Sequence, residues 1–361
     1  MAAFVWDWLE EAGLQPQKQE VEPGRENVLA FAEGADASKA LLLCSHTDTV
    51  GVADMVIDPF DPVVRDGKLY GRGACDTKAS LAAMMIAFRD RAGAGNLPAN
   101  LVLLASCGEE YNLMGVKHYA RQAGSRLSGA IFGEPTQLQV ITAHKGVARY
   151  RIICRGRSGH SSQPRQADNA IYAMSKVLPL VERFARDVET RPPHPQLGAE
   201  TLAVTLISGG HQVNVIPDRC EASIDWRVLP GRRTDDCRHE LAQALKDKLH
   251  ELDLPSTSAT HAPEKIEIEP VSEYAPMETD PDHPMSQALL AATDGLATKP
   301  GMAVAHFATD ASAFVAFDIP TLVLGPGNIA QAHTKDEHIQ VEQLEKGLAV
   351  HQRFLAANWG I

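Results

Sequence analysis

Residues 41–48 read LLLCSHTD, an apolar run that ends in a histidine and an aspartate. The run predicts a buried strand, on which every second side chain points to the same face. His46 and Asp48 therefore share a face, which suits a metal-binding imidazole with a carboxylate to orient it. Taken alone, the pattern is more typical of a hydrogen-bonded histidine at a strand end. The metal interpretation therefore depends on the rest of the chain.

Two later strands end in a similar way. Residues 101–106 (LVLLAS) are followed by Glu109 and Glu110, and the apolar run at residues 128–132 is followed by Glu134. Open α/β sheets bind ligands outside the carboxyl ends of their strands. The sequence therefore predicts one site to which several strand ends contribute.

The order of the predicted elements indicates an α/β fold. Up to about residue 147, strands alternate with helices, which predicts a mixed sheet with helices on both faces. One helix is expected at residues 79–89, and an Asp66-Gly67 turn is expected to join two short strands into a hairpin.

A different, α+β pattern interrupts this fold. It contains the strands VARYRIICRG, TLAVTLISGG and CEASIDWRVLPG with two helices, and the Pro- and Ser-bearing segment 254–263 leads out of it. The alternation of helices and strands returns after Pro276. We expect a catalytic domain in two parts, 1–147 and 269–361, with an inserted domain at 148–268.

Length and charge exclude several classes of protein. A chain of 361 residues favours about two domains. The formal charge of −12 argues against a nucleic-acid partner and against an anionic membrane surface, since both bind basic patches. No apolar run approaches the ~20 residues that span a bilayer.

The six cysteines form no C-x-x-C pair and no dense framework. This usage is typical of reduced thiols, so we expect a cytoplasmic protein. Cys44, Cys75 and Cys107 lie within two residues of motif carboxylates or histidines. Metal ligation is one interpretation of these three, and a small buried packing residue is the favoured one.

Two imidazoles and three carboxylates make up the candidate metal ligands: His46, Asp76, Glu110, Glu134 and His333. This set of nitrogen and oxygen donors suits zinc, cobalt or manganese. Two metals that share one carboxylate, with one histidine and one further carboxylate each, leave a position for a bridging water. Glu109, beside a ligand, is then free to act as a general base.

Six motifs resemble those of a known family, in its order and over nearly the whole chain: SHTDTV (45–50), GRGACDTKAS (71–80), GEE (108–110), GEPT (133–136), SGHSS (158–162) and GPGNIAQAHTKDEHI (325–339). The chain is similar to the dinuclear zinc aminoacylases and carboxypeptidases, which include glutamate carboxypeptidase, succinyl-diaminopimelate desuccinylase and acetylornithine deacetylase. The resemblance implies a zinc-hydrolase catalytic domain with two Zn²⁺ per subunit and Co²⁺ as a substitute.

The resemblance also assigns the five ligands. It implies that His46 and Glu134 bind one metal, that Glu110 and His333 bind the other, and that Asp76 bridges the two.

Further roles follow from the same resemblance. It implies that Asp48 orients His46 and that Glu109 is the base and proton shuttle. It also predicts a cis peptide bond between Asp76 and Thr77.

The inserted domain is implied to be a lid that carries the interface of a homodimer. His160 then matches a histidine that such lids bring from the partner subunit to the oxyanion. The alternative is a turn histidine that bonds the adjacent serines.

Within the family, FGEPT…AHKG and VLGPGNIAQAHTKDE resemble the acetylornithine deacetylase branch best. Arg227 is a candidate partner for the substrate α-carboxylate or, equally, for a salt bridge within the lid. Asn214 is a candidate contact for the acyl-amide group or a turn cap. Asp310 is a candidate partner for a cationic side chain, although some relatives are expected to have glutamate there.

The resulting hypothesis is a two-metal amidohydrolase that converts N2-acetyl-L-ornithine to ornithine and acetate in arginine biosynthesis. The alternatives within the family are N-acetylcitrulline deacetylation, desuccinylation of succinyl-diaminopimelate, and dipeptide or carboxy-terminal peptide hydrolysis. An alternative from another class is a non-catalytic metal- or amino-acid-binding protein. Glu109 and His160 argue against the latter, because metal binding alone requires neither.

Overall fold

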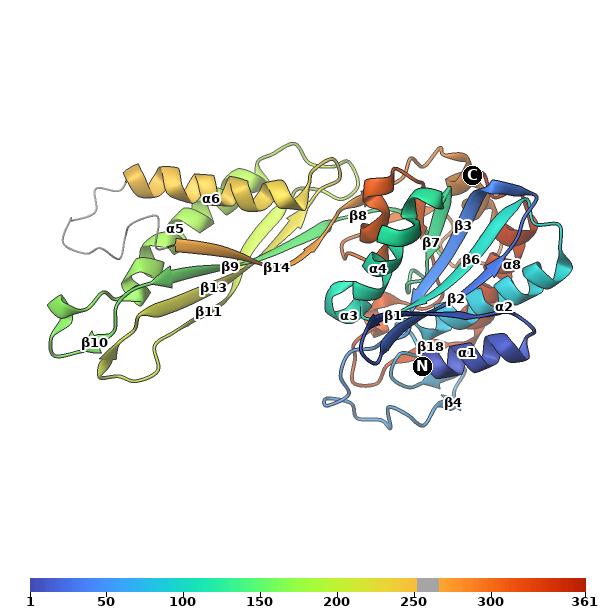
Figure 1. Ribbon diagram of the computed structural model, residues 1–361, viewed down its shortest axis with the longest axis horizontal. Coiled ribbons are helices and arrows are strands. Elements are labelled where there is room, and N and C mark those ends of the chain that lie inside the picture. Colours follow the sequence, from blue (N-terminus) through green and yellow to red (C-terminus); the bar gives the residue numbers. More distant parts are fainter. Residues whose placement is uncertain (252–265) are drawn as a thin grey trace. The chain divides into compact units, whose positions relative to one another are not determined.

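The computed structural model describes residues 1–251 and 266–361, so the predicted exit segment 254–263 lies outside the described residues. The chain divides into two units. The first contains Met1–Ala143, Met277–Ala305 and Thr309–Ile361, and the second contains His144–Pro276 and His306–Ala308 (Figure 1). The first unit is therefore discontinuous in sequence.

A mixed sheet forms the centre of the first unit. Its strands follow the order β1-β2-β6-β3-β7-β17-β8-β15, and β16 pairs with β8. Their bounds are β1 Gln17–Glu22, β2 Arg25–Ala32, β3 Asp36–His46, β6 Ala99–Ser106, β7 Gly129–Phe132, β8 Val140–His144, β15 Met277–Glu278, β16 Met302–Ala305 and β17 Thr321–Val323.

The four central strands, β6, β3, β7 and β17, run parallel to one another. His46 pairs with Ser106, and Cys44 pairs with Phe132, so the ends of β3, β6 and β7 lie at one edge of the sheet. The predicted gathering of strand ends is confirmed. A side chain that follows any of these strands is delivered to the same place.

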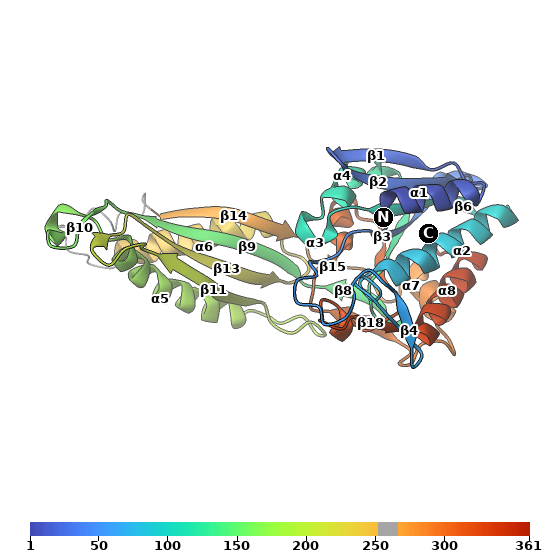
Figure 2. The ribbon, with the colours of Figure 1, turned by 90° about the horizontal axis from the view of Figure 1, so that it is seen from below.

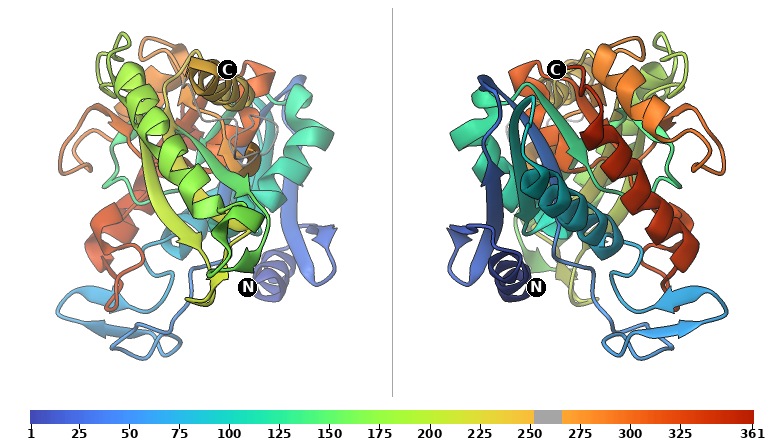
Figure 3. Two further views of the ribbon diagram at one scale, coloured as in Figure 1. Left: turned by 90° about the vertical axis from the view of Figure 1, so that its left-hand side faces the viewer. Right: turned by 90° about the vertical axis from the view of Figure 1, so that its right-hand side faces the viewer.

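Helices cover both faces of this sheet, as predicted. Leu41 and Leu43 of β3 belong to the core shared with α1 (Ala2–Glu11), α2 (Lys78–Ala94), α7 (Pro284–Ala292) and α8 (Val341–Ala356). The last three helices lie side by side in Figure 3. On the opposite face lie α4 (Met114–Ala123) and the 3₁₀ helix η5 (Asp310–Phe317), where the Phe132 and Phe314 ring centres are 5.5 Å apart.

The first unit also contains a small three-stranded sheet, which includes the predicted hairpin. It contains β4 (Val63–Arg65), β5 (Lys68–Tyr70) and β18 (His338–Gln340). Asp66 and Gly67 have φ values of 51° and 72°, and this pair of left-handed residues makes the tight turn between β4 and β5. The hairpin prediction is confirmed.

The second unit is an antiparallel sheet with two helices packed on one face (Figure 2). Its strand order is β11-β13-β9-β14. The bounds are β9 Gly146–Arg155, β11 Thr201–Gly209, β13 Arg219–Val228, β14 Ile266–Tyr274, α5 Ala170–Glu189 and α6 Thr234–Glu251. Asn169 begins α5, because its side-chain oxygen accepts hydrogen bonds from the N–H groups of Ile171 and Tyr172.

Two edge strands were not predicted from the sequence. β1 reads QKQEVE, and β14 contains Glu267, Glu269 and Pro270. An edge strand is bonded on one side only, and natural edge strands often carry charge or proline. Neither strand therefore shows the apolar pattern that identifies the central ones. None of the helices in the described ranges combines the length and apolar character that a membrane span requires.

His351, in α8, is fully buried, and neither ring nitrogen has a hydrogen-bond partner among the described residues. Burial lowers its pKa from 6.5 to about 4. Between these pH values the unfolded chain binds a proton that the native chain does not. The free energy of unfolding therefore falls by up to about 1.4 kcal/mol for each pH unit of acidification.

We predict that His351→Met removes this contribution. In urea denaturation from pH 8 to pH 4, the stability of the wild type relative to the variant should fall below about pH 6.5 and stay constant above pH 7. A stability difference that does not change with pH would show that His351 does not titrate in this way.

Candidate metal centre

Asp76 lies in the loop before α2, and the peptide bond that joins it to Thr77 is cis, as predicted. Its carboxylate contacts two imidazoles at once. Asp76 Oδ1 is 3.1 Å from His46 Nε2, and Oδ2 is 3.2 Å from His333 Nε2. The two oxygens of one buried carboxylate thus face two different histidines.

Glu110 completes this group from the end of β6. It lies in the short helix α3 (Glu109–Asn112), and its Oε1 is 3.0 Å from His333 Nε2. Single donor atoms of His46, Asp76 and Glu110 all lie within 4.8 Å of one another. Four of the five predicted ligands are therefore brought together, from segments far apart in the sequence.

Glu134 follows β7 and is buried, with 5% of its surface exposed. It is not part of the closest group of donor atoms. Its negative charge nevertheless helps to raise the pKa of His46, and the charges of Asp76 and Glu109 help to raise the pKa of Glu134. The structure thus places it at the same edge of the sheet as the other four.

Asp48 contacts His46 more closely through its main chain than through its carboxylate. His46 Nδ1 bonds the main-chain oxygen of Asp48 at 3.0 Å, whereas the Asp48 carboxylate is 3.8 Å away. That carboxylate accepts hydrogen bonds from the N–H groups of Gly108, Glu109 and Glu110. Asp48 therefore holds His46 with its main chain and the segment that carries Glu109 and Glu110 with its side chain.

The site concentrates negative charge in a poorly solvated place. Burial raises the pKa of Glu109 to about 8 and raises that of Glu134 well above its usual value, and the charge of Asp76 adds to both effects. Burial alone would lower the pKa of His46, but its bond to Asp76 and the charges of Glu109 and Glu134 raise it. Bonds to Asp76 and Glu110 raise the pKa of His333 to about 10.

These properties fit divalent cations. The donors are imidazole nitrogens and carboxylate oxygens, they converge from several directions, and their excess negative charge favours a positive ion. Asp76, with an oxygen toward each histidine, is placed to serve two ions. The set needs no thiolate, and Cys44, Cys75 and Cys107 are buried, with pKa values raised by burial.

Asp310 is at the first turn of η5 and is 3% exposed. Its Oδ2 accepts a hydrogen bond from Ser106 Oγ at 2.7 Å, and burial raises its pKa to about 6. Its other oxygen has no partner within residues 1–251 and 266–361. The carboxylate adds to the charge around His46 and Glu109.

The other three predicted site residues belong to the second unit. His160 is exposed in β10 (Gly159–His160), and its Nδ1 is 2.6 Å from Ser162 Oγ. Asn214 is exposed, and its main-chain oxygen accepts a bond from Ser161. Arg227 forms an ion pair with Asp225 at 2.6 Å, the contact expected of a salt bridge within this unit.

The sequence interpretation missed Glu337 and Arg72, which form a buried ion pair at 2.6 Å. Glu337 also accepts hydrogen bonds from the N–H groups of Cys75 and Asp76. The available signal was its position, four residues after His333. That position did not distinguish it from Asp336.

Comparison with known proteins agrees with this geometry. The sequence pattern of Peptidase family M20/M25/M40 matches residues 42–357. The chain is 35% identical, over 94% of its length and 84% of the relative, to an acetylornithine deacetylase from Proteus mirabilis. It is 34% identical, over 92% of its length and 84% of the relative, to an acetylornithine deacetylase from Klebsiella pneumoniae.

Solved structures share the fold. An M20 family metallo-carboxypeptidase from Sulfolobus solfataricus superposes with a TM-score of 0.75 at 16% identity, over 98% of this chain and 92% of that one. A dinuclear metal-binding M20 peptidase from Bacillus subtilis superposes with a TM-score of 0.68 at 14% identity, over 100% of this chain and 92% of that one.

Proposed function

The chain belongs to Peptidase family M20/M25/M40 and is a hydrolase of amide bonds, and we propose that it removes the acetyl group from an N-acetylated amino acid. The resemblance predicted from the motifs is thereby confirmed at the level of the family. Members of this family depend on metal, and we propose two Zn²⁺ per subunit, with Co²⁺ able to replace them.

One observation carries the proposal of a two-metal site: Asp76 directs one oxygen to His46 and the other to His333. A carboxylate that bridges two metals needs this arrangement. We assign His46 and Glu134 to one metal, and Glu110 and His333 to the other. Two bound cations would lower the pKa of a water molecule and polarise the amide carbonyl.

Glu109 is the proposed base. It is beside a ligand, it is partly buried, and its pKa is raised to about 8, within the range in which a carboxyl can both accept and release a proton near neutral pH. Glu109 takes a proton from the attacking water and gives it to the nitrogen of the leaving amine. The hydrogen bond from its N–H group to Asp48 holds the main chain of Glu109 in place before a substrate binds.

The proposal that the substrate has an acetyl group and an ornithine side chain rests on the relatives. Two proteins with 35% and 34% identity are acetylornithine deacetylases, which supports the same substrate here. Asp310, Asn214 and Arg227 remain proposed substrate contacts. Arg227 is the least supported by its surroundings, because Asp225 already pairs with it.

A substrate panel tests the proposed function. N2-acetyl-L-ornithine, N-acetylcitrulline, N-succinyl-diaminopimelate and a set of dipeptides would be assayed with added zinc or cobalt. We expect the highest kcat/KM for N2-acetyl-L-ornithine and loss of activity after chelation. A higher value for a succinyl or dipeptide substrate would change the assignment, and metal binding without turnover of any substrate would favour a binding protein.

Glu109→Gln keeps the shape of the side chain but removes the base. We expect kcat to fall by about 10²–10⁴-fold with metal content unchanged, because the amide cannot accept the proton. Glu110→Gln is the matched comparison, and it should lose metal as well as activity. Near-normal turnover in Glu109→Gln would assign the base to another group.

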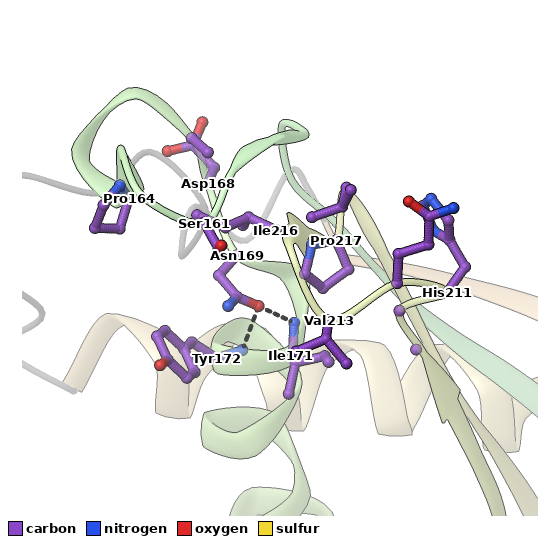
Figure 4. A pocket seen from close by; sticks show the side chains of 15 residues that line it. Ser161, Pro164, Asp168, Asn169, Ile171, Tyr172, His211, Val213, Ile216 and Pro217 are labelled. Carbon is purple, nitrogen blue, oxygen red and sulfur yellow. Dashed lines mark hydrogen bonds between the residues drawn. The ribbon is translucent and has the colours of Figure 1, made fainter.

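We infer that the second unit forms a homodimer through β11. This edge strand has no charged residue, and its Leu206 and Ile207 are 69% and 58% exposed. The opposite edge, β14, carries glutamates and a proline that oppose pairing. A hollow of about 710 Å³ adjoins β11 and α5, where Tyr172, Val213 and Ser161 line it (Figure 4).

The proposed role of His160 connects to this interface. Ser161 lines the hollow directly beside it, so a partner that covers the hollow would fix the turn that carries His160. We propose that His160 stabilises the oxyanion formed from the amide carbonyl, acting on the site of the partner subunit.

Leu206→Arg places a charge on the proposed interface. We expect the wild type to sediment as a dimer and this variant as a monomer. The new guanidinium would be buried in the interface without an acidic partner, and the cost of its desolvation would oppose association. Val271→Arg on β14, a residue that is 54% exposed at the other edge, is the control and should stay dimeric. A monomeric wild type, or a dimeric Leu206→Arg, would contradict the interface.

A further inference from the structure

We propose that Glu337 is a positioning residue that fixes Asp76 relative to His333. It is not one of the donors at the metal centre. It lies within the first unit, as do both residues that it positions. The inference rests on the proposed function, since it assumes that Asp76 and His333 bind metal.

The Glu337 carboxylate makes four contacts, all with one loop. Its Oε2 accepts from Arg72 Nη1 at 2.6 Å and from the N–H group of Gly73 at 3.0 Å. Its Oε1 accepts from the N–H groups of Cys75 and Asp76, both at 2.9 Å. The last contact is to the main chain of the proposed bridging ligand itself.

These contacts leave Glu337 with no capacity to bind a metal. Each of its oxygens already has two donors, and the side chain is fully buried with Arg72 as its countercharge. A buried carboxylate is stable only when it is paired and hydrogen-bonded in this way. The same contacts hold the loop of residues 72–76 in one conformation.

The other end of the linkage is His333, four residues earlier in the chain. The connecting segment is held by its main chain as well as by Glu337. The N–H group of Gly71 donates to the oxygen of Glu337 at 3.1 Å, and that of Val56 donates to the oxygen of Lys335 at 2.9 Å. Movement of Glu337 would therefore change the separation between Asp76 and His333.

Asp48 supports this interpretation, because it acts in the same way at the other side of the centre. Its carboxylate also bonds main-chain N–H groups, in this case those of Gly108, Glu109 and Glu110. Two acidic side chains outside the donor set thus hold the main chain of two ligand-bearing segments. Residues of this kind commonly change metal affinity by 10–100-fold when they are replaced.

Cobalt binding to the metal-free protein tests the inference without use of activity. Glu337→Gln keeps the size of the side chain but replaces one carboxylate oxygen with an NH₂ group. The two N–H bonds of this group would face two donors of the loop in place of an acceptor. We expect Co²⁺, followed by its visible absorption, to bind about 10–100-fold more weakly than to the wild type. Glu345→Gln, an exposed change in α8, is the matched control and should bind as the wild type does.

Thermal unfolding of the metal-free variants separates positioning from simple stabilisation. A lower Tm together with wild-type Co²⁺ affinity in Glu337→Gln would overturn the inference. If that variant does not fold, Glu337→Asp decides the matter, because it keeps the charge but is too short to reach all four donors. It should bind Co²⁺ with intermediate affinity, and wild-type affinity would overturn the inference.

The same titrations distinguish this inference from the proposed function. A wild type that binds no Co²⁺ would contradict the metal centre and, with it, the role of Glu337. A wild type that binds two equivalents, alongside variants with unchanged affinity, would leave the proposed function standing and remove only the role of Glu337.

Discussion

Asp76 presents one carboxylate oxygen to His46 and the other to His333, and it is buried while it does so. A buried carboxylate is tolerated when opposite charge and hydrogen bonds surround it. The sheet supplies His46, the segment after β6 supplies Glu110, and the end of the chain supplies His333. The first unit is arranged so that these distant segments meet around one acidic side chain.

Much of this arrangement followed from the sequence because parallel strands impose it. Once β3, β6 and β7 were identified as buried strands, His46, Glu109, Glu110 and Glu134 had to lie at one edge. Helices on both faces followed from the same alternation. The family motifs added Asp76 and His333, which no strand pattern would have placed.

The remainder depended on contacts that leave little trace in composition. The carboxylate of Asp48 bonds the main chain of residues 108–110 and lies 3.8 Å from His46 Nδ1. Sequence spacing does not reveal the direction of a side chain after a strand has ended. Glu337 follows another acidic residue, Asp336, and the sequence did not show which of the two bonds the loop of residues 72–76. The β1 and β14 strands carry the charges that edge strands tolerate, so they lacked the apolar signal of the centre.

The discontinuity of the first unit also has a consequence for biosynthesis. The ribosome makes β3, β6 and β7 early, but β17, which pairs with β7, and the segment with His333 and Glu337 emerge only after the whole second unit. Domains tend to fold as their sequence emerges. The second unit can therefore fold while the acidic edge is still incomplete, so the centre is completed only late in the synthesis of each chain.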